Sequence, residues 1–511
     1  MKNAPLRADI KGDIALADLL RFARVDTLEQ VSGRLIADAH VQGRLRDVAR
    51  LKPADLRALT ISGSARLKDA TLKMKGIRHV VSGLNTELVL DGNDAEVRAL
   101  TCSLQGSDLH LSGALRNLMP YLLFDDQPLA IEARGSSPRV DLAALLRSDG
   151  ATAGKDYALQ LPALVQLDLQ AQVQELVFER FTATGITGTI RLRDRVLRAS
   201  PVMFNTAKGG VLGSLALDAR GSGPYPLTID ADVKDIDVKQ LFAEFQEFGQ
   251  SFITSQHLSG TATAQVAFAS PVSPALQLDL DGLRCTVDIA IRNGGIAHHQ
   301  PLIDVATYVK QNKLVAPFVD AEGLRDRLAD VRFDRLENRI EIRDRRVIVP
   351  AMTVHNNVMD IELSGTHGFD DRIDHHLNFR LGDLLKKGTP DDAFGPVADD
   401  GTGLRIFLHM YGDAGAPQFE NDGAMAARRR SEGIKEQTAE LRSILHNELN
   451  PFKKRDDAAA TGDPERPAAH FDVEFDADTA RTTRARDQRK RGFGALFEEK
   501  PEEKEVIEVE P

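Results

Sequence analysis

The sequence predicts a mainly β protein in which repeated antiparallel strands form an elongated curled sheet or groove. Three observations support this fold class. Apolar and polar residues alternate with period two, Gly, Asn and Asp separate the alternating segments, and one order of strands recurs three times. A few short helices, a C-terminal amphipathic helix and a disordered tail complete the predicted architecture.

The alternation places apolar side chains on one face of a strand and polar side chains on the other, because successive strand residues point to opposite faces. It is clearest around Leu227–Val233, around Ile340 and Ile342, and from Leu377 to Leu381. Asp91-Gly92-Asn93 and Asn293-Gly294-Gly295 are examples of the turn sequences between such segments. We therefore expect mostly antiparallel strands, each with one apolar face.

The strands recur in a fixed order, which predicts a divergent β repeat with insertions. Residues 84–133, 185–233 and 336–381 each read as four strands, and a short helical segment follows the last strand in each case. Those helical segments span residues 140–147, 238–248 and 383–387. An ordinary antiparallel meander would give a similar order, so the repeat itself is a hypothesis.

The chain begins in the middle of this scheme. Residues 6–14 read as the last strand of a unit and residues 16–23 as the helix that follows it. We therefore interpret residues 1–24 as the end of a truncated upstream unit. Two β units follow at residues 25–150 and 151–255.

Residues 256–420 form the last β region, which is interrupted by two short amphipathic helices. These helices are expected at residues 302–312 and 323–329. Strands are expected at residues 261–268 and 283–292, the latter with Cys285, Val287, Ile289 and Ile291 on one face. Beyond them, residues 424–450 read as an amphipathic helix and residues 453–511 as a disordered charged tail.

Composition excludes several classes of protein. Asp and Glu number 76 against 65 Lys and Arg, and the chain has no Trp, so we expect no nucleic-acid partner. Cys102 and Cys285 are the two cysteines, too few for a disulfide framework or a cysteine-rich zinc module. We expect two separate buried thiols rather than one bridge. No run approaches the roughly 18–20 apolar residues of a membrane span, and residues 1–9 lack the apolar stretch of a signal peptide.

Motifs for chemistry are weak. Asp374-His375-His376 is similar to a metal-binding triplet, but adjacent strand residues point to opposite faces and do not easily share one ion. His298-His299 has the same defect. No HExxH, P-loop or GxSxG sequence occurs. We therefore expect no catalytic residue, no metal and no cofactor, and we keep a hydrolase only as a third alternative.

The predicted C-terminal helix has basic ends and an apolar stripe, which suits an anionic membrane surface. The membrane-surface candidates are Arg428, Arg429, Arg430, Leu441 and Leu445. The alternatives are a helix that packs on the sheet, a helix that docks in a groove of a partner protein and, third, a helix that binds nucleic acid.

Residues 258–387 resemble the C-terminal region of the AsmA family of Gram-negative bacteria. The resemblance rests on spacing and turns in five segments: Asn293–Ile296, Val331–Asn338, Ile340–Asp344, Ile348–Met352 and Leu363–Asp370. One departure is Asp344-Arg345-Arg346, where the family commonly has Asp-Gly, so we expect a different turn type there. We expect a further departure at the N-terminus, where the membrane anchor and leading domain typical of the family do not precede residues 1–24, in keeping with the interpretation of a truncated chain.

The resemblance implies an envelope protein at the periplasmic face, membrane-anchored in its full-length form, with a role in outer-membrane biogenesis. Relatives are similar to bridge-like lipid-transfer proteins, in which a long curled sheet forms an apolar groove. The implied partners are phospholipid or another envelope lipid, a membrane surface and outer-membrane assembly proteins. No enzymatic activity is implied.

Two functions remain open after this argument. The first is non-enzymatic holding or transfer of lipid in an apolar β groove. The second is a structural or regulatory envelope protein that modulates outer-membrane protein assembly and has a dry β core. The residues expected to face lipid in the first case are Ile340, Ile342, Ile361, Leu363, Leu377 and Phe379.

Overall fold

The structure is a computed structural model of the chain, in which residues 4–18, 28–45, 52–74, 79–146, 159–311, 316, 319–385 and 405–429 are described. The chain divides into a unit at residues 1–435 and a second at residues 436–511. The second lies outside the described residues, so everything below concerns the first.

Strands dominate this first unit. They are β1 Ala4–Ala15, β2 Leu28–Leu45, β3 Leu59–Met74, β4 Val80–Asp91, β5 Asp94–Leu104, β6 Ser107–Arg116, β7 Leu129–Asp141, β8 Val165–Phe178, β9 Phe181–Arg193, β10 Val196–Thr206, β11 Gly209–Asp218, β12 Tyr225–Asp237, β13 Leu258–Val272, β14 Arg284–Ala297, β15 Asp330–Arg343, β16 Arg346–Val354, β17 Ile361–Gly368, β18 Arg372–Arg380, β19 Arg405–Asp413 and β20 Ala416–Asn421. The helices are α2 Pro53–Leu56, α3 Leu118–Leu123, α4 Leu142–Leu146, α5 Val238–Glu244, η2 Gln246–Gly249, α6 Gln300–Gln311, α7 Ala321–Leu328 and α8 Leu381–Leu385.

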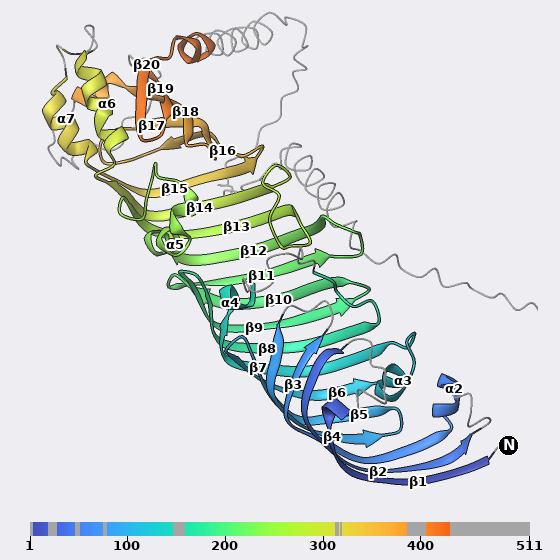
Figure 1. Ribbon diagram of the computed structural model, residues 1–511. Coiled ribbons are helices and arrows are strands. Elements are labelled where there is room, and N and C mark those ends of the chain that lie inside the picture. Colours follow the sequence, from blue (N-terminus) through green and yellow to red (C-terminus); the bar gives the residue numbers. More distant parts are fainter. Residues whose placement is uncertain are drawn as a thin grey trace, which may run out of the picture. The chain divides into compact units, whose positions relative to one another are not determined.

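The twenty strands form one long sheet that curls without closing, which confirms the predicted fold class (Figure 1). Each strand pairs with the next one along the chain, and the pairs are antiparallel with one exception. β7 and β8 run parallel. A parallel pair needs a crossover connection, and here the segment that includes α4 joins the two strands.

The repeated order appears in the structure as four strands followed by a short helix. It is seen in β4–β7 with α4, in β9–β12 with α5, and in β15–β18 with α8. The two amphipathic helices expected near residues 302–312 and 323–329 are α6 and α7. The strands expected at 261–268 and 283–292 are β13 and β14.

The turn between β15 and β16 differs from the expectation. Arg343 pairs with Arg346, so Asp344 and Arg345 form a two-residue hairpin loop. Both have positive φ, 53° and 56°, as a type I′ turn requires. The turn that Asp-Gly would favour is therefore kept, and the expectation of another turn type was wrong.

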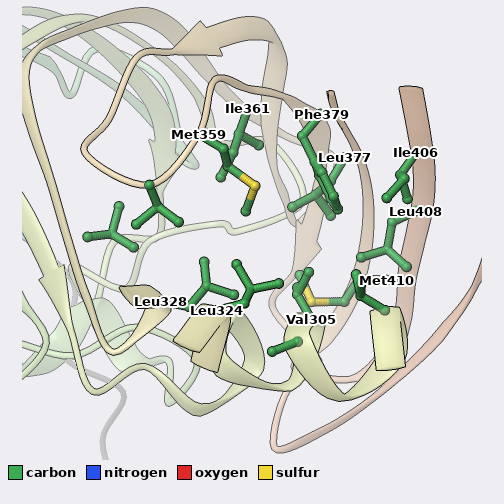
Figure 2. Packing of buried hydrophobic residues seen from close by; sticks show 14 of the residues in the cluster. Val305, Leu324, Leu328, Met359, Ile361, Leu377, Phe379, Ile406, Leu408 and Met410 are labelled. Atoms are coloured by element: carbon green, nitrogen blue, oxygen red, sulfur yellow. The ribbon is translucent and has the colours of Figure 1, made fainter. Parts of the chain in front are cut away.

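The sheet changes character after β15. β14 and β15 pair along their whole length, whereas β15 and β16 pair only over the three residues next to the turn. The last strands separate from β15 and pack with α6 and α7 around a closed hydrophobic core (Figure 2). Val305 of α6 and Leu324 and Leu328 of α7 face Leu377 and Leu408 across this core. We call this part, β16–β20 with α6 and α7, the C-terminal module.

The predicted C-terminal helix lies largely, and the predicted tail wholly, outside the described residues. Residues 423–429 are helical, which agrees with the start of the helix expected at 424–450, and the rest of that helix lies outside the described residues. The tail predicted at residues 453–511 also lies outside them.

Candidate functional site

One face of strands β1–β15 carries a central band of apolar residues that runs from β1 to β15. Directly paired residues of neighbouring strands lie on the same face, so the pairing register joins them into rows that cross the sheet. The row through Ile342 crosses all of these strands without a charged or polar side chain other than one thiol. It consists of Gly12, Ala37, Ala65, Leu88, Val97, Gly113, Ala133, Leu169, Ile190, Ala199, Leu215, Ile229, Phe268, Cys285 and Ile342.

The flanking rows have the same character. The row that runs from Ile14 to Ile340 has Thr86 as its one polar side chain, and the row that runs from Ile10 through Leu227 ends at Ser270. We call these three rows together the apolar strip. No residue of the strip is charged. A hydrocarbon can therefore cover the strip without removing any charged side chain from water.

The opposite face carries the charges. Its cross-strand ion pairs include Lys11 with Asp38 at 3.2 Å, Arg191 with Asp168 at 3.2 Å and Arg339 with Asp288 at 2.5 Å. These side chains are largely exposed, so each pair contributes little to stability. Their main consequence is that this face of the sheet is hydrophilic, whereas the face with the apolar strip is hydrophobic.

Small hydrophobic clusters cover the ends of the strands on the apolar side. Leu56 of α2 and Leu118 of α3 pack with Ile61, Leu90 and Leu129 at one end of the N-terminal strands. Leu217 and Tyr225 pack with the segment around Leu159 further along. Among the described elements, the helices with the main contacts to β5–β13 are α3, α4 and α5. The clusters therefore form rims rather than a second layer.

The middle of the strip is left without such a cover by the described residues. Leu169, Ile190, Leu215, Ile229 and Phe268 are partly exposed, and none belongs to a buried cluster. At a strand spacing of about 4.8 Å, β1–β15 extend the strip over roughly 65 Å. Across β12, the three rows span Leu227 to Ala231, about 13 Å at ~3.3 Å per residue. This width is close to the length of an acyl chain, about 15 Å, which is half of a ~30 Å hydrocarbon core.

The two cysteines lie on the apolar side of the sheet. Both are free and buried, as expected from the sequence. Burial raises the pKa of the Cys285 thiol to about 11, and it also raises the pKa of Cys102, with the nearby Asp108 carboxylate adding to the effect. Both thiols therefore stay protonated at neutral pH and act as apolar groups rather than nucleophiles.

The six residues expected to face lipid do not form one patch. Ile340 and Ile342 belong to the apolar strip. Ile361, Leu377 and Phe379 are buried in the core of the C-terminal module, and Leu363 packs against that core. The expectation was wrong for these four because β16 leaves β15 after three pairs and because α6 and α7 cover the last strands.

The basic candidates for a membrane surface are only partly described. The Arg429 guanidinium donates to the Glu362 carboxylate of β17, so this charge binds within the protein, which favours the alternative of a helix that packs on the sheet. Arg428 also has an interaction partner. Arg430, Leu441 and Leu445 lie outside the described residues, and for them the membrane surface stays a prediction.

The histidines behave as strand geometry predicts. His375 is buried and its ring stacks against Phe252, whereas His376 points to the other face. His299 is buried too, and its Nε2 lies 2.9 Å from the Phe252 carbonyl oxygen. Burial lowers the pKa of both His299 and His375 to about 4, so both rings are neutral core groups at physiological pH.

Sequence reasoning did not find most of the strip. Alternation assigns each strand an apolar face, but pairing register decides which residues meet, and register was unknown for Leu169, Ile190 and Phe268. The sequence signal that could have located the row was the recurrence of Gly and Ala in successive strands, at Gly12, Ala37, Ala65, Gly113, Ala133 and Ala199. Among the described residues no helix is long and apolar enough to cross a membrane.

Searches of protein-family models, of curated proteins and of solved structures found no match to this chain. The proposed function therefore rests on the geometry of the sheet and on the sequence resemblance alone.

Proposed function

We propose that this protein is a non-enzymatic lipid carrier that holds or transfers lipid along the apolar strip of β1–β15. The observation that carries the proposal is the row from Gly12 to Ile342, which crosses fifteen paired strands without a charge. Exposed apolar area costs about 25 cal/mol per Å², so a strip of this length needs a cover. Acyl chains cover it without any demand for polar partners.

The shape of the strip supports transfer rather than storage of one molecule. Packed side chains border the strip along the side of Leu90 and Leu217 and along part of the other side near Leu67 and Leu100, and the uncharged surface continues from strand to strand. A lipid can move along such a surface with its headgroup in water, because no charged side chain interrupts the three rows. We also propose, on the resemblance to the AsmA family, that this takes place at the periplasmic face of the envelope in support of outer-membrane biogenesis.

The alternative is a structural or regulatory envelope protein whose strip is covered by protein. A dry cover would come from a second sheet or another chain. The two functions differ in one measurable property: a lipid carrier purifies with lipid, and a dry scaffold does not.

The test is lipid content and lipid transfer of the native protein. We expect mass spectrometry to find phospholipid in protein purified without detergent, and we expect the protein to move a fluorescent phospholipid between vesicles. Phe268→Asp places a carboxylate in the middle of the strip. We expect transfer to fall about tenfold or more, because the carboxylate removes about 2 kcal/mol of apolar contact.

The matched control is Ala267→Asp, one residue away on the exposed opposite face. It adds the same charge to the same strand, so transfer should stay at the parent level. A parent protein without lipid that moves none between vesicles would reject the proposal and support the scaffold. Transfer at the parent level by both Phe268→Asp and Ala267→Asp would exclude the strip as the path.

A further inference from the structure

We infer that the polar face of the C-terminal module holds a divalent transition-metal ion between His376, His409 and Asp374. The motif Asp374-His375-His376 alone does not make this site, because His375 points into the core. The site arises from pairing instead: His376 of β18 lies directly opposite His409 of β19. Their rings stack with centroids 4.8 Å apart and planes 4° from parallel.

Each imidazole is held by a carboxylate on its Nδ1 side. His376 Nδ1 lies 2.6 Å from Asp422 Oδ2, and His409 Nδ1 lies 2.9 Å from Glu420 Oε1. A carboxylate accepts the Nδ1 proton of a neutral imidazole and leaves the Nε2 lone pair for a ligand. This carboxylate–histidine arrangement is the one that orients and strengthens metal-binding histidines in proteins.

The Nε2 atoms of both histidines lie near a third carboxylate. Asp374 Oδ1 lies 2.8 Å from His409 Nε2 and 3.5 Å from His376 Nε2, and the three ligand atoms all lie within 4.8 Å of one another. The side chains of His409, His376 and Asp374 are 22%, 37% and 59% exposed, so an ion can enter and keep water in its remaining positions. A bound ion replaces the hydrogen bond between His409 and Asp374.

The ligand set selects the class of ion. Two imidazole nitrogens and one carboxylate oxygen suit Zn²⁺ and the neighbouring first-row ions, whereas Ca²⁺ and Mg²⁺ prefer oxygen ligands throughout. The ion would join β18 to β19. Through Asp422, whose other oxygen caps the helix at residues 423–429 by accepting the Met425 N–H at 2.9 Å, it would also fix the start of that helix.

The test is Zn²⁺ binding by the untagged full chain, measured by titration calorimetry and by the visible spectrum of Co²⁺. We expect one ion per chain and a rise in the midpoint of thermal unfolding with added Zn²⁺. His376→Ala and His409→Ala should each abolish this binding. Glu420→Gln leaves all three ligands in place and should weaken it about 10–100-fold.

The matched control is His355→Ala. His355 also pairs with a carboxylate, Asp360 at 2.9 Å, but it is highly exposed and stands outside the His376–His409 cluster. This variant should bind Zn²⁺ like the parent. Far-UV circular dichroism verifies that each variant stays folded. The absence of binding by the folded parent at 100-fold molar excess of Zn²⁺, or parent-like binding by both His376→Ala and His409→Ala, would overturn the inference.

Discussion

Leu377→Asp should unfold the C-terminal module and leave the long sheet intact. Leu377 of β18 is 6% exposed, lies beside Leu408 of β19 in the sheet and faces α6 and α7 in the core. The substitution removes about 2–3 kcal/mol of apolar burial and leaves an unpaired carboxylate at a cost of about 3–5 kcal/mol more. The sum is comparable to the whole stability of a small domain, about 5–15 kcal/mol.

The comparison with Phe268→Asp makes this prediction specific. Phe268 lies on the part of the strip that is partly exposed, so its carboxylate can stay hydrated. We expect a loss of only about 1–2 kcal/mol there. Both variants add one charge to the apolar side of a strand, so a difference between them reports the dryness of the two surroundings.

Hydrogen exchange followed by mass spectrometry measures the effect region by region. In Leu377→Asp we expect the protection of β17–β19 to collapse while β8–β14 keep theirs, because only three residue pairs join β15 to β16. Leu377→Met conserves volume and should cost less than about 1.5 kcal/mol. Parent-like protection of β17–β19 in Leu377→Asp would refute the closed core and restore Leu377 to an open groove.

Three further predictions concern titration, a polar network and the C-terminal helix. The folded pKa of His299 is about 4 and its ordinary value is 6.5, so the unfolded chain binds more protons between these values and stability falls as pH decreases through that window. We expect urea unfolding to show a loss of about 2 kcal/mol from pH 7 to pH 5 from this group, and His299→Gln should remove that share of the slope. Glu362→Ala should destabilise the C-terminal module by about 2–4 kcal/mol, because the partly buried Arg405 guanidinium, which donates to Glu362 at 2.9 Å, loses this acceptor; Glu362→Gln should cost less, and chemical denaturation compares the two. Leu441→Asp with Leu445→Asp should abolish binding to anionic liposomes in a flotation assay if the apolar stripe docks on a membrane, and unchanged flotation or loss of the sheet's far-UV signal would contradict that role.

Local sequence was sufficient for the fold class. The alternation from Leu227 to Val233 assigns a face to each residue of β12, because the strand period of two leaves no freedom. The amphipathic spacing at residues 302–312 likewise identified α6, since Val305, Ala306 and Val309 share one helical face and are buried. Such patterns depend on a few neighbouring residues, so they can be recognised without knowing how the rest of the chain folds.

The tertiary structure decided what each apolar face meets. Ile342 and Leu377 have the same alternating context in the sequence, yet one lies on the open strip and the other in a dry core. The difference comes from α6 and α7, which pack on the strands that separate from β15 and reach β15 itself at Val331, eleven residues before Ile342. Burial of this kind depends on where a distant segment of the chain packs. The alternation of apolar and polar residues within one strand therefore cannot predict it.

The pairing of His376 with His409 has the same origin. The two residues are 33 positions apart in the chain, and only the β18–β19 register sets them opposite one another. A shift of one residue would place His409 on the core face, because side chains alternate along a strand. The sequence by itself determined that this protein is a long one-sided sheet, and the register and the covering helices decided which parts of that sheet are core, strip and polar site.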